Sequence, residues 1–252
     1  MNVTRYIIAL CAIVATCNAT NNNDCGVQVN DIYSEFDNKH PWVAHIPLKP
    51  RTYNPAADIQ CVGVLISEKY VITSSLCLQF VVSRVKFFQS GISGSSVHVM
   101  EVNVEKWMSY DKAEVALLKL ATEIKPSDFP KPICLPFDEQ NNVENGTIYY
   151  TSSWSRVKKL SPFVYEKNMI KNHIVACESN ENFVCLHPIG NDSICFKDEG
   201  SPIMYYQQDK WILYGILNVF NRAESPCLDK SPAKGSLITQ DVLKWITDVT
   251  KN

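Results

Sequence analysis

The stretch Cys195-Phe-Lys-Asp-Glu-Gly-Ser-Pro-Ile203 combines a cysteine, two adjacent carboxylates, a glycine and a proline. Cys195 is one of ten cysteines in the chain, and two others, Cys11 and Cys17, lie in an apolar run near the N-terminus. An even number of cysteines remains, which in a secreted chain is typical of disulfides. A zinc site is less favoured, because the sequence has no Cys-x-x-Cys pair and no clustered Cys and His spacing.

The N-terminal residues follow the pattern of a secretory signal. Arg5 precedes an apolar run from Tyr6 to Cys17, and Asn18-Ala-Thr20 follows it. A membrane anchor is disfavoured, because about 12 apolar residues fall short of the roughly 20 that span a bilayer. We therefore expect residues 1–19 to be a signal peptide and the mature protein to be soluble, secreted and extracellular, without membrane association.

Charge and length narrow the function classes. Lys and Arg number 24 and Asp and Glu number 26, a net charge of −2. Because there is no basic excess, nucleic acid is not an expected partner. After removal of a signal peptide, about 230 residues remain, enough for one large all-β domain or two small ones.

Short runs rich in β-branched residues predict many strands, as in a sandwich or in barrels. The clearest runs are Val62–Ile66, Tyr70–Thr73, Val81–Phe88 and Trp211–Phe220. From Val97 to Val104 apolar and polar residues alternate, with a slip at Met100-Glu101. The slip would turn the later side chains to the other face of the strand unless a bulge absorbs it.

One helix is predicted, at the C-terminal end of the sequence. Val242, Ile246 and Val249 follow a helical stripe, and Asp241 can cap the first turn.

Eight motifs, in this order along the chain, resemble those of chymotrypsin-like (trypsin-like) serine proteases. Cys195–Ile203 resembles the family's Cys-x-Gly-Asp-Ser-Gly-Gly-Pro-Leu, which carries the nucleophile. The other seven are Pro41–Val43, Cys61–Ile66, Tyr70–Cys77, Glu114–Leu120, Pro132–Pro136, Gly215–Leu217 and Val242–Ile246. The resemblance implies an all-β fold of two six-stranded antiparallel β-barrels ending in an α-helix, and the chain looks like an inactive, arthropod-like homologue.

The same resemblance implies the domain organisation and the disulfides. It gives a protease-like domain over 41–252, with a first barrel at about 41–135, a second at about 146–240 and the helix at about 241–250. Residues 20–40 would form an N-terminal segment tied to the body by a disulfide. The implied pairs are Cys25–Cys134, Cys61–Cys77, Cys177–Cys185 and Cys195–Cys227. Tyr149 and Tyr205 stand where a further family bridge would be.

The catalytic positions are degenerate. By resemblance, Leu76 occupies the histidine position, Glu114 the aspartate position and Glu199 the serine position. Leu76 cannot accept a proton, so Glu114 has no base to orient. A glycosidase-like use of the two glutamates is disfavoured, since no base or formed oxyanion hole supports it. We therefore expect no catalytic residues, no cofactor and no metal site.

The implied oxyanion hole and substrate groove are altered as well. Lys197 replaces the family's glycine before the aspartate, and Ser201 replaces the second glycine after the nucleophile. The remaining groove positions are Ser193 at the pocket floor and Asn218, Val219 and Phe220 in place of Ser-Trp-Gly, with Phe220 expected to block the pocket.

Activation by cleavage is not expected. Gln28–Asp31, at the family's cleavage site, has no basic residue, so Asp198 lacks the ammonium partner that a new N-terminus would supply. Because a buried unpaired carboxylate is costly, we expect Asp198 to be solvated or paired otherwise.

Some polar residues fall outside the motifs. The sequons at Asn145 and Asn191 are glycosylation candidates, and a third sequon lies at Asn18. The histidines His40, His45, His98, His173 and His187 are expected to be surface or loop residues and not replacement bases.

The resemblance implies a secreted pseudoenzyme that acts by binding. Homologues of this kind serve as cofactors, decoys or regulators in extracellular proteolytic cascades, in immunity or reproduction. The expected partner is an extracellular protease, a protease inhibitor or a protease substrate. Two alternatives stay open: a weakly active hydrolase with displaced catalytic groups, and a glycan-binding or adhesion module on the same scaffold.

Overall fold

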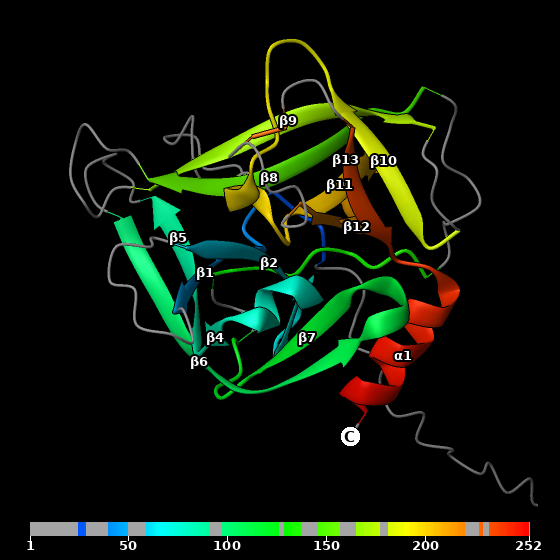
Figure 1. Ribbon diagram of the computed structural model, residues 1–252. Helices are drawn as coiled ribbons and strands as arrows, with labels where there is room; N and C mark the ends of the chain where they lie inside the picture. The colour runs from blue at the N-terminus through cyan, green and yellow to red at the C-terminus, as the bar shows by residue number, and fades with distance from the viewer. Residues whose placement is uncertain are drawn as a thin grey trace, which may run out of the picture.

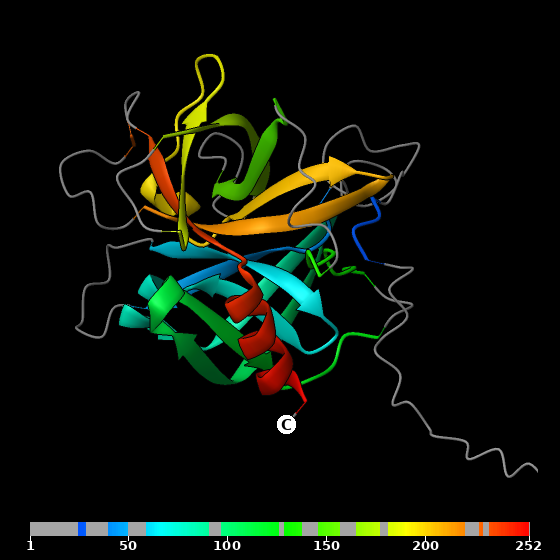
Figure 2. The same cartoon turned by 90° about the vertical axis from the view of Figure 1, so that its right-hand side faces the viewer.

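The computed structural model describes residues 25–28, 40–49, 59–90, 97–125, 129–137, 146–156, 165–176, 181–219, 227–228 and 232–251. Two antiparallel barrels lie one above the other, and a helix lies against the lower one (Figures 1 and 2). Within the described residues, no helix is long and apolar enough to cross a membrane.

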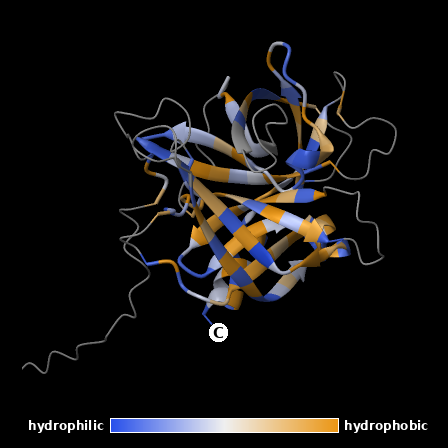
Figure 3. Cartoon of the chain, turned by 90° about the vertical axis from the view of Figure 1, so that its left-hand side faces the viewer, coloured by the Kyte–Doolittle hydropathy of each residue, from blue (hydrophilic) through white to orange (hydrophobic). Residues whose placement is uncertain are grey.

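The first barrel closes through six strands in the order β1-β2-β3-β7-β6-β5 and back to β1, with β4 paired to the end of β1. Its strands are β1 (Val43–Lys49), β2 (Gln60–Ser67), β3 (Tyr70–Ser74), β4 (Val81–Val82), β5 (Arg84–Ser90), β6 (Val97–Tyr110) and β7 (Val115–Leu120). Hydrophobic and hydrophilic residues alternate along these strands (Figure 3), as expected when one face of each strand packs inside a barrel.

The second barrel is a closed ring of six strands in the order β10-β13-β12-β11-β8-β9. The strands are β8 (Tyr149–Arg156), β9 (Tyr165–Val175), β10 (Phe183–Pro188), β11 (Pro202–Gln207), β12 (Lys210–Asn218) and β13 (Ala233–Leu237). The two-barrel fold expected from the resemblance is therefore present, with the first barrel's strands in 43–120 and the second's in 149–237.

Of the two outcomes open at Met100-Glu101, a change of face or a bulge, the strand shows the change of face. β5 and β6 pair without a shift from Arg84↔Asn103 to Ser90↔Val97, and the irregularity lies between Val104 and Lys106, where β6 pairs with β7. The strand keeps the phase of buried Val102 and leaves Val99 50% exposed. Val99 thus lies on the solvent-facing side of β6, opposite the face that carries Val102.

The C-terminal helix α1 (Gln240–Thr250) fastens the second barrel to the first. Its cap is Thr239, whose hydroxyl accepts from Val242 N–H at 3.4 Å, and not Asp241 as expected; Asp241 lies inside the first turn. Val242, Leu243 and Ile246 are buried in the same hydrophobic core as the apolar residues of the first barrel. Trp245 stacks on Tyr110 of β6 at 5.3 Å between ring centroids.

Disulfides hold the loops and the N-terminal segment. Bridges join Cys61 to Cys77, Cys195 to Cys227 and Cys25 to Cys134, as the resemblance implies. Cys185 is also disulfide-bonded, while Cys177 lies outside the described residues. Next to Cys25, Gly26 N–H donates to Pro132 O at 2.9 Å and Gly26 O accepts from Trp211 N–H at 3.0 Å. The segment at 25–28 is therefore attached by backbone as well as by sulfur.

A tyrosine cluster occupies the place of the missing bridge. Tyr149 and Tyr205, predicted to replace its two cysteines, lie 6.0 Å apart between ring centroids, and Tyr214 packs 4.8 Å from Tyr149. Burial, with the nearby Tyr214 hydroxyl, raises the pKa of Tyr149, so the phenol stays neutral. Aromatic packing of this kind adds about 0.5–1.5 kcal/mol per pair beyond area burial.

Candidate functional site

The three triad positions gather at the seam, the contact between the two barrels. Leu76 lies on the short helix η1 (Ser75–Gln79) after β3, and Glu114 closes η2 (Asp111–Ala113) just before β7. β3 and β7 are antiparallel neighbours, and Ser75 N–H donates to Glu114 O at 3.0 Å. Glu199 comes from the second barrel, directly after η3 (Phe196–Asp198).

Leu76 is held by a capped helical turn. The Ser74 hydroxyl accepts from Leu76 N–H at 3.2 Å and begins η1, and Cys77 in the next position forms the bridge to Cys61. The leucine side chain is half-buried. An isobutyl group has no lone pair, so this position offers no general base.

Glu114 joins the first barrel to the second through side-chain contacts. Its carboxylate accepts from Asn218 Nδ2 at 3.1 Å and lies 3.2 Å from Lys234 Nζ. Asn218 Nδ2 also donates to Ser236 Oγ at 2.6 Å, and Lys234 Nζ sits 3.5 Å from the centre of the Phe183 ring. The Glu114 carboxylate is thus committed to a cross-barrel network with a cation and an amide.

Glu199 is fully buried, and backbone groups fix its position. Its carbonyl accepts from Val62 N–H at 2.7 Å, and its carboxylate oxygen Oε2 accepts from Val219 N–H. Gly200 follows with φ +81°, where a Cβ would overlap Val62 O and Thr73 Oγ1. Only glycine fits there, and the turn that it permits turns the Glu199 side chain toward β12.

The backbone N–H of Glu199 is used inside η3. Glu199 N–H donates to Phe196 O at 3.2 Å, so it belongs to the helical turn. Lys197 O accepts from Gln60 Nε2 at 3.3 Å, and the same amide donates to Trp154 O at 2.6 Å. The Gln60 side chain of β2 therefore links the Lys197 carbonyl to the Trp154 carbonyl of β8.

Asp198 is paired otherwise, one of the two outcomes expected. It is 3% exposed, its Oδ1 accepts from the Ser153 hydroxyl at 2.5 Å, and its Oδ2 accepts from Cys195 N–H at 2.7 Å. Burial raises the pKa of the Asp198 carboxyl, and the hydrogen bonds from Ser153 and Cys195 and the Lys197 charge oppose that shift.

The other groove positions lie in different settings. Ser193, expected at a pocket floor, is exposed, because it belongs to the turn that follows β10. Val219 is 1% exposed and lies just after β12. Ser201 is buried opposite Leu217 of β12, whose N–H donates to Ser201 O at 2.9 Å. Phe220, and Val29–Asp31 of the former cleavage site, lie outside the described residues, as does Asn145. Asn191 is exposed on the same turn as Ser193.

Two histidines differ from the expectation of surface or loop positions. His40 is 1% exposed and packs between Trp42 and Trp211, with ring centroids at 5.5 and 4.6 Å. His45 is 4% exposed in β1, 5.9 Å from the Phe88 ring. Both imidazoles are buried against aromatic rings, His40 just before β1 and His45 within it. His98 and His173 are exposed at the surface, as expected, in β6 and β9, and His187 is half-buried in β10.

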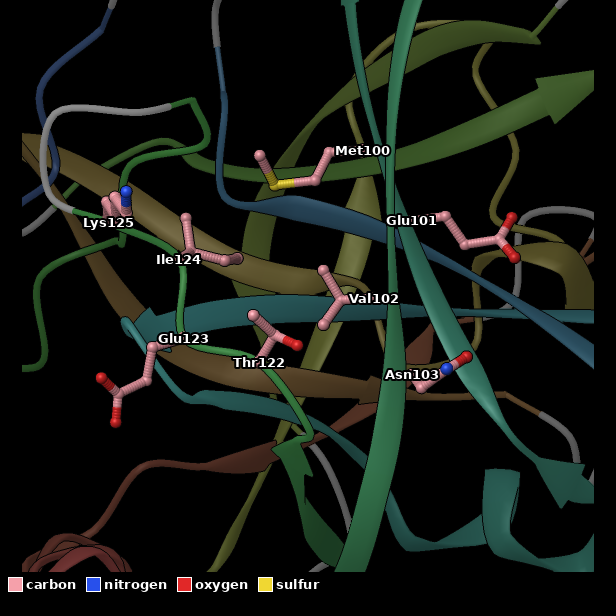
Figure 4. A pocket seen from close by; sticks show the side chains of 8 residues that line it. All are labelled: Met100, Glu101, Val102, Asn103, Thr122, Glu123, Ile124 and Lys125. Atoms are coloured by element: carbon pink, nitrogen blue, oxygen red, sulfur yellow. The ribbon is translucent and has the colours of Figure 1, made fainter.

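A cavity of about 400 Å³ lies away from the triad positions, between β6 and the segment after β7. It is lined by Met100, Glu101, Val102, Asn103, Thr122, Glu123, Ile124 and Lys125 (Figure 4). Met100, Val102 and Ile124 form its apolar wall, while Glu101 is paired with Arg84 and Lys86 and Glu123 with Lys69. Among the described residues, no group of three or more His, Cys, Asp or Glu could hold a metal ion.

Sequence reasoning missed four residues that define the site: Ser153, Lys234, Ser236 and Gln60. Each makes its contact across a long sequence separation, 45 residues for Ser153 to Asp198 and 120 for Lys234 to Glu114. None lies in a motif, so the only signal was the expectation that Asp198 needs a partner.

Sequence comparison relates this chain to proteins named as serine proteases. The family model described as Trypsin matches residues 30–245. A venom serine protease of Polistes dominula is 26% identical over 280 residues, covering 95% of this chain and 93% of that protein. The CLIP domain-containing serine protease B15 of Anopheles gambiae is 24% identical over 242 residues, covering 79% of this chain and 65% of that protein.

Two further similarities concern a longer protein and the fold. An ovochymase of Halocynthia roretzi is 25% identical over 183 residues, which cover 62% of this chain but only 11% of the ovochymase. The solved structure of HL collagenase has a TM-score of 0.62 at 19% identity, over 90% of this chain and 98% of that one. Since the family model spans most of the sequence and both barrels are closed, the chain belongs to the trypsin family.

Proposed function

We propose that this chain is a secreted, non-catalytic member of the trypsin family that acts by binding an extracellular protein. The observation that carries the proposal is Leu76, which puts a half-buried aliphatic side chain at the position of the general base. Without an imidazole there, nothing takes the proton of a nucleophile, whatever its identity.

The surroundings of Glu199 and Glu114 support the same proposal. The Glu199 carboxylate is fully buried and accepts from Val219 N–H, so it is not accessible to solvent. The Glu114 carboxylate is engaged by Asn218 and Lys234. The Glu199 N–H is consumed by Phe196 O. These contacts of the Glu199 and Glu114 carboxylates and of the Glu199 N–H support the proposal that the chain acts without catalysis.

The retained scaffold supports a binding role. Both barrels are closed, six cysteines form three of the bridges that the family resemblance implies, and the Asp198 carboxylate is held by Ser153 and Cys195. The disulfides and the name of the venom relative favour an extracellular location. The serine protease names of the relatives favour a partner in a proteolytic cascade, as cofactor, decoy or regulator.

Reactivity tests the absence of catalysis. The purified mature protein is incubated with a fluorophosphonate probe and with a library of fluorogenic peptides, beside active trypsin at equal concentration. We expect no stoichiometric labelling and no peptide cleavage. Labelling of a single residue in a homogeneous sample, mapped by mass spectrometry, overturns the proposal and favours a hydrolase with displaced groups.

Capture from the native extracellular fluid tests the binding role. The immobilised protein is compared with the same protein reduced and alkylated, which removes the folded surface. A protease, a protease inhibitor or a protease substrate retained only by the folded form supports the proposal. Retention of glycoproteins that is lost on enzymatic deglycosylation contradicts it and favours a glycan-binding module.

A further inference from the structure

Two histidines oppose each other on the second barrel. His173 of β9 and His187 of β10 are direct partners in the antiparallel register. Ile189 N–H donates to Lys171 O at 2.7 Å, two residues further along both strands, so His173–His187 is also a hydrogen-bonded position of the ladder. Side chains opposed in this way have Cβ atoms about 4.5–5.5 Å apart on one face. Two imidazoles at that separation can reach one ion.

The pair faces outward from the barrel. The neighbours in the alternating pattern, Leu186 and Asn172, are both fully buried, so the histidines lie on the opposite face. His173 is exposed and His187 is half-buried. β9 and β10 are adjacent strands of the closed second barrel (Figure 1).

One hydrogen bond presets the tautomer of His187. Its Nδ1 lies 2.9 Å from Pro188 O. A carbonyl oxygen only accepts, so Nδ1 carries the proton, and in the neutral ring the lone pair is left on Nε2. A backbone carbonyl on the second nitrogen is the usual way in which proteins orient a metal-binding histidine. Within the described structure, neither His187 Nε2 nor the His173 ring makes another hydrogen bond or ion pair.

We propose that His173 and His187 form a surface site for a divalent transition-metal ion. Imidazole nitrogens suit Cu²⁺, Ni²⁺ and Zn²⁺, whereas Ca²⁺ and Mg²⁺ take oxygen ligands. Two protein ligands leave the other coordination positions to water, so the site is open and exchangeable. The same donor set predicts the tightest binding for Cu²⁺.

An ion at this site would cross-link two strands that close the barrel. β9 and β10 are neighbours only through this ladder and the chain that joins them, and the pair lies near the end of it, at His187↔His173 and Pro188↔Asn172. A ligand that binds the folded state and not the unfolded one raises the unfolding temperature in proportion to the logarithm of its concentration. The site is independent of the proposed function, because none of its residues belongs to the seam.

The test titrates the mature protein with Cu²⁺ and, separately, with Zn²⁺ and Ca²⁺, by calorimetry. We expect one Cu²⁺ per chain, weaker Zn²⁺ binding at the same site and no Ca²⁺ binding. The single variants His173→Gln and His187→Gln should each lose affinity by at least about tenfold, the lower end of what losing even an outer-shell partner costs. His98→Gln is the matched control, because His98 is an exposed strand histidine opposite Gln89.

A spectroscopic readout separates coordination from loose surface binding. Electron paramagnetic resonance of the Cu²⁺ complex should show two equatorial imidazole nitrogens in the parent protein and in the His98 variant, and one in either single variant. Far-UV circular dichroism checks that each variant is folded. Binding that is equal in all four proteins, or no Cu²⁺ binding in a folded parent protein, overturns the proposal.

Discussion

Glu114 and Glu199 both place a carboxylate where a trypsin-like enzyme has a catalytic residue, yet the seam treats them differently. Glu114 has a 30% exposed side chain and is held by other side chains, Asn218 and Lys234. Glu199 is fully buried and is held by backbone groups of Val62 and Val219. The Glu114 end of the seam therefore depends on partly exposed charges that solvent screens. The Glu199 end, which we call the rigid end, depends on backbone hydrogen bonds in a fully packed setting.

Gly200→Ala should lower the free energy of unfolding more than any other substitution considered, because Gly200 directly follows Glu199 at the rigid end of the seam. The new Cβ would overlap Val62 O and Thr73 Oγ1 at φ +81°, so strain and overpacking add. We expect about 4 kcal/mol of lost unfolding free energy, measured by urea denaturation. The matched control is Gly190→Ala, with φ +86° and nothing within 4 Å, where only the backbone strain of about 1–2 kcal/mol applies. Equal losses at the two glycines would show that the contact with Val62 does not constrain Glu199.

Asp198→Ala should follow in size. It leaves the buried Ser153 hydroxyl and the Cys195 N–H without their acceptor, at a cost of about 2–4 kcal/mol. Asp198→Asn is the conservative comparison, since the amide oxygen still accepts from Cys195 and the Ser153 hydroxyl can turn to accept from the amide nitrogen. If Asp198→Ala loses no more unfolding free energy than Asp198→Asn, the hydrogen bonds of Asp198 do not stabilise the rigid end of the seam.

The difference in stability between the parent protein and Asp198→Asn should depend on pH. Burial raises the pKa of Asp198 in the folded state, so the folded state binds this proton more tightly than the unfolded state. The contribution of the carboxyl to stability is then full below its unfolded pKa of about 3.9, and it is lost as pH rises through the folded value. Asp198→Asn does not titrate, so its stability relative to the parent protein should improve as pH rises from 4 to 7. A difference in urea midpoints that stays constant or reverses would contradict the shift.

At the Glu114 end the effects should be small and salt-sensitive. The Glu114–Lys234 pair is about one-third exposed on both sides, so the coupling energy from a double-mutant cycle with Glu114→Gln and Lys234→Met should be about 0.5–1 kcal/mol. It should decrease between low and high salt, because exposed charges are screened. A coupling that is large and independent of salt would make the two ends of the seam alike.

The fold could be predicted from the sequence because its signals are local and ordered. The motifs around Cys61, Cys77 and Cys195 mark strands and turns whose order allows one topology, and the disulfide pairs followed from that resemblance. The site was less predictable, because its contacts join residues far apart. Ser153 has no motif, and only the packing of β8 against η3 brings it to Asp198.

Local sequence patterns gave wrong or ambiguous predictions at positions where contacts with distant residues determine burial and local structure. His40 and His45 are polar in the sequence, but neighbouring rings bury them. The helix begins one residue before the acidic residue expected to cap it, because Thr239 is extended and its hydroxyl reaches Val242 N–H. The alternation at Met100 was ambiguous because an exposed valine and a bulge give the same pattern.

Glu199→Ser should produce the smallest effect of all: we expect no gain of proteolytic activity. The serine would stand after η3 with its N–H still donated to Phe196 O, and no base would lie beside it, because Leu76 has no titratable group. We expect fluorophosphonate labelling equal to that of the parent protein. A variant in which Leu76→His is added separates the two causes, since labelling there but not in the single variant would assign the block to the missing base. Labelling of the single variant would mean that the buried end of the seam opens to solvent, which the packing around Gly200 and the full burial of Glu199 oppose.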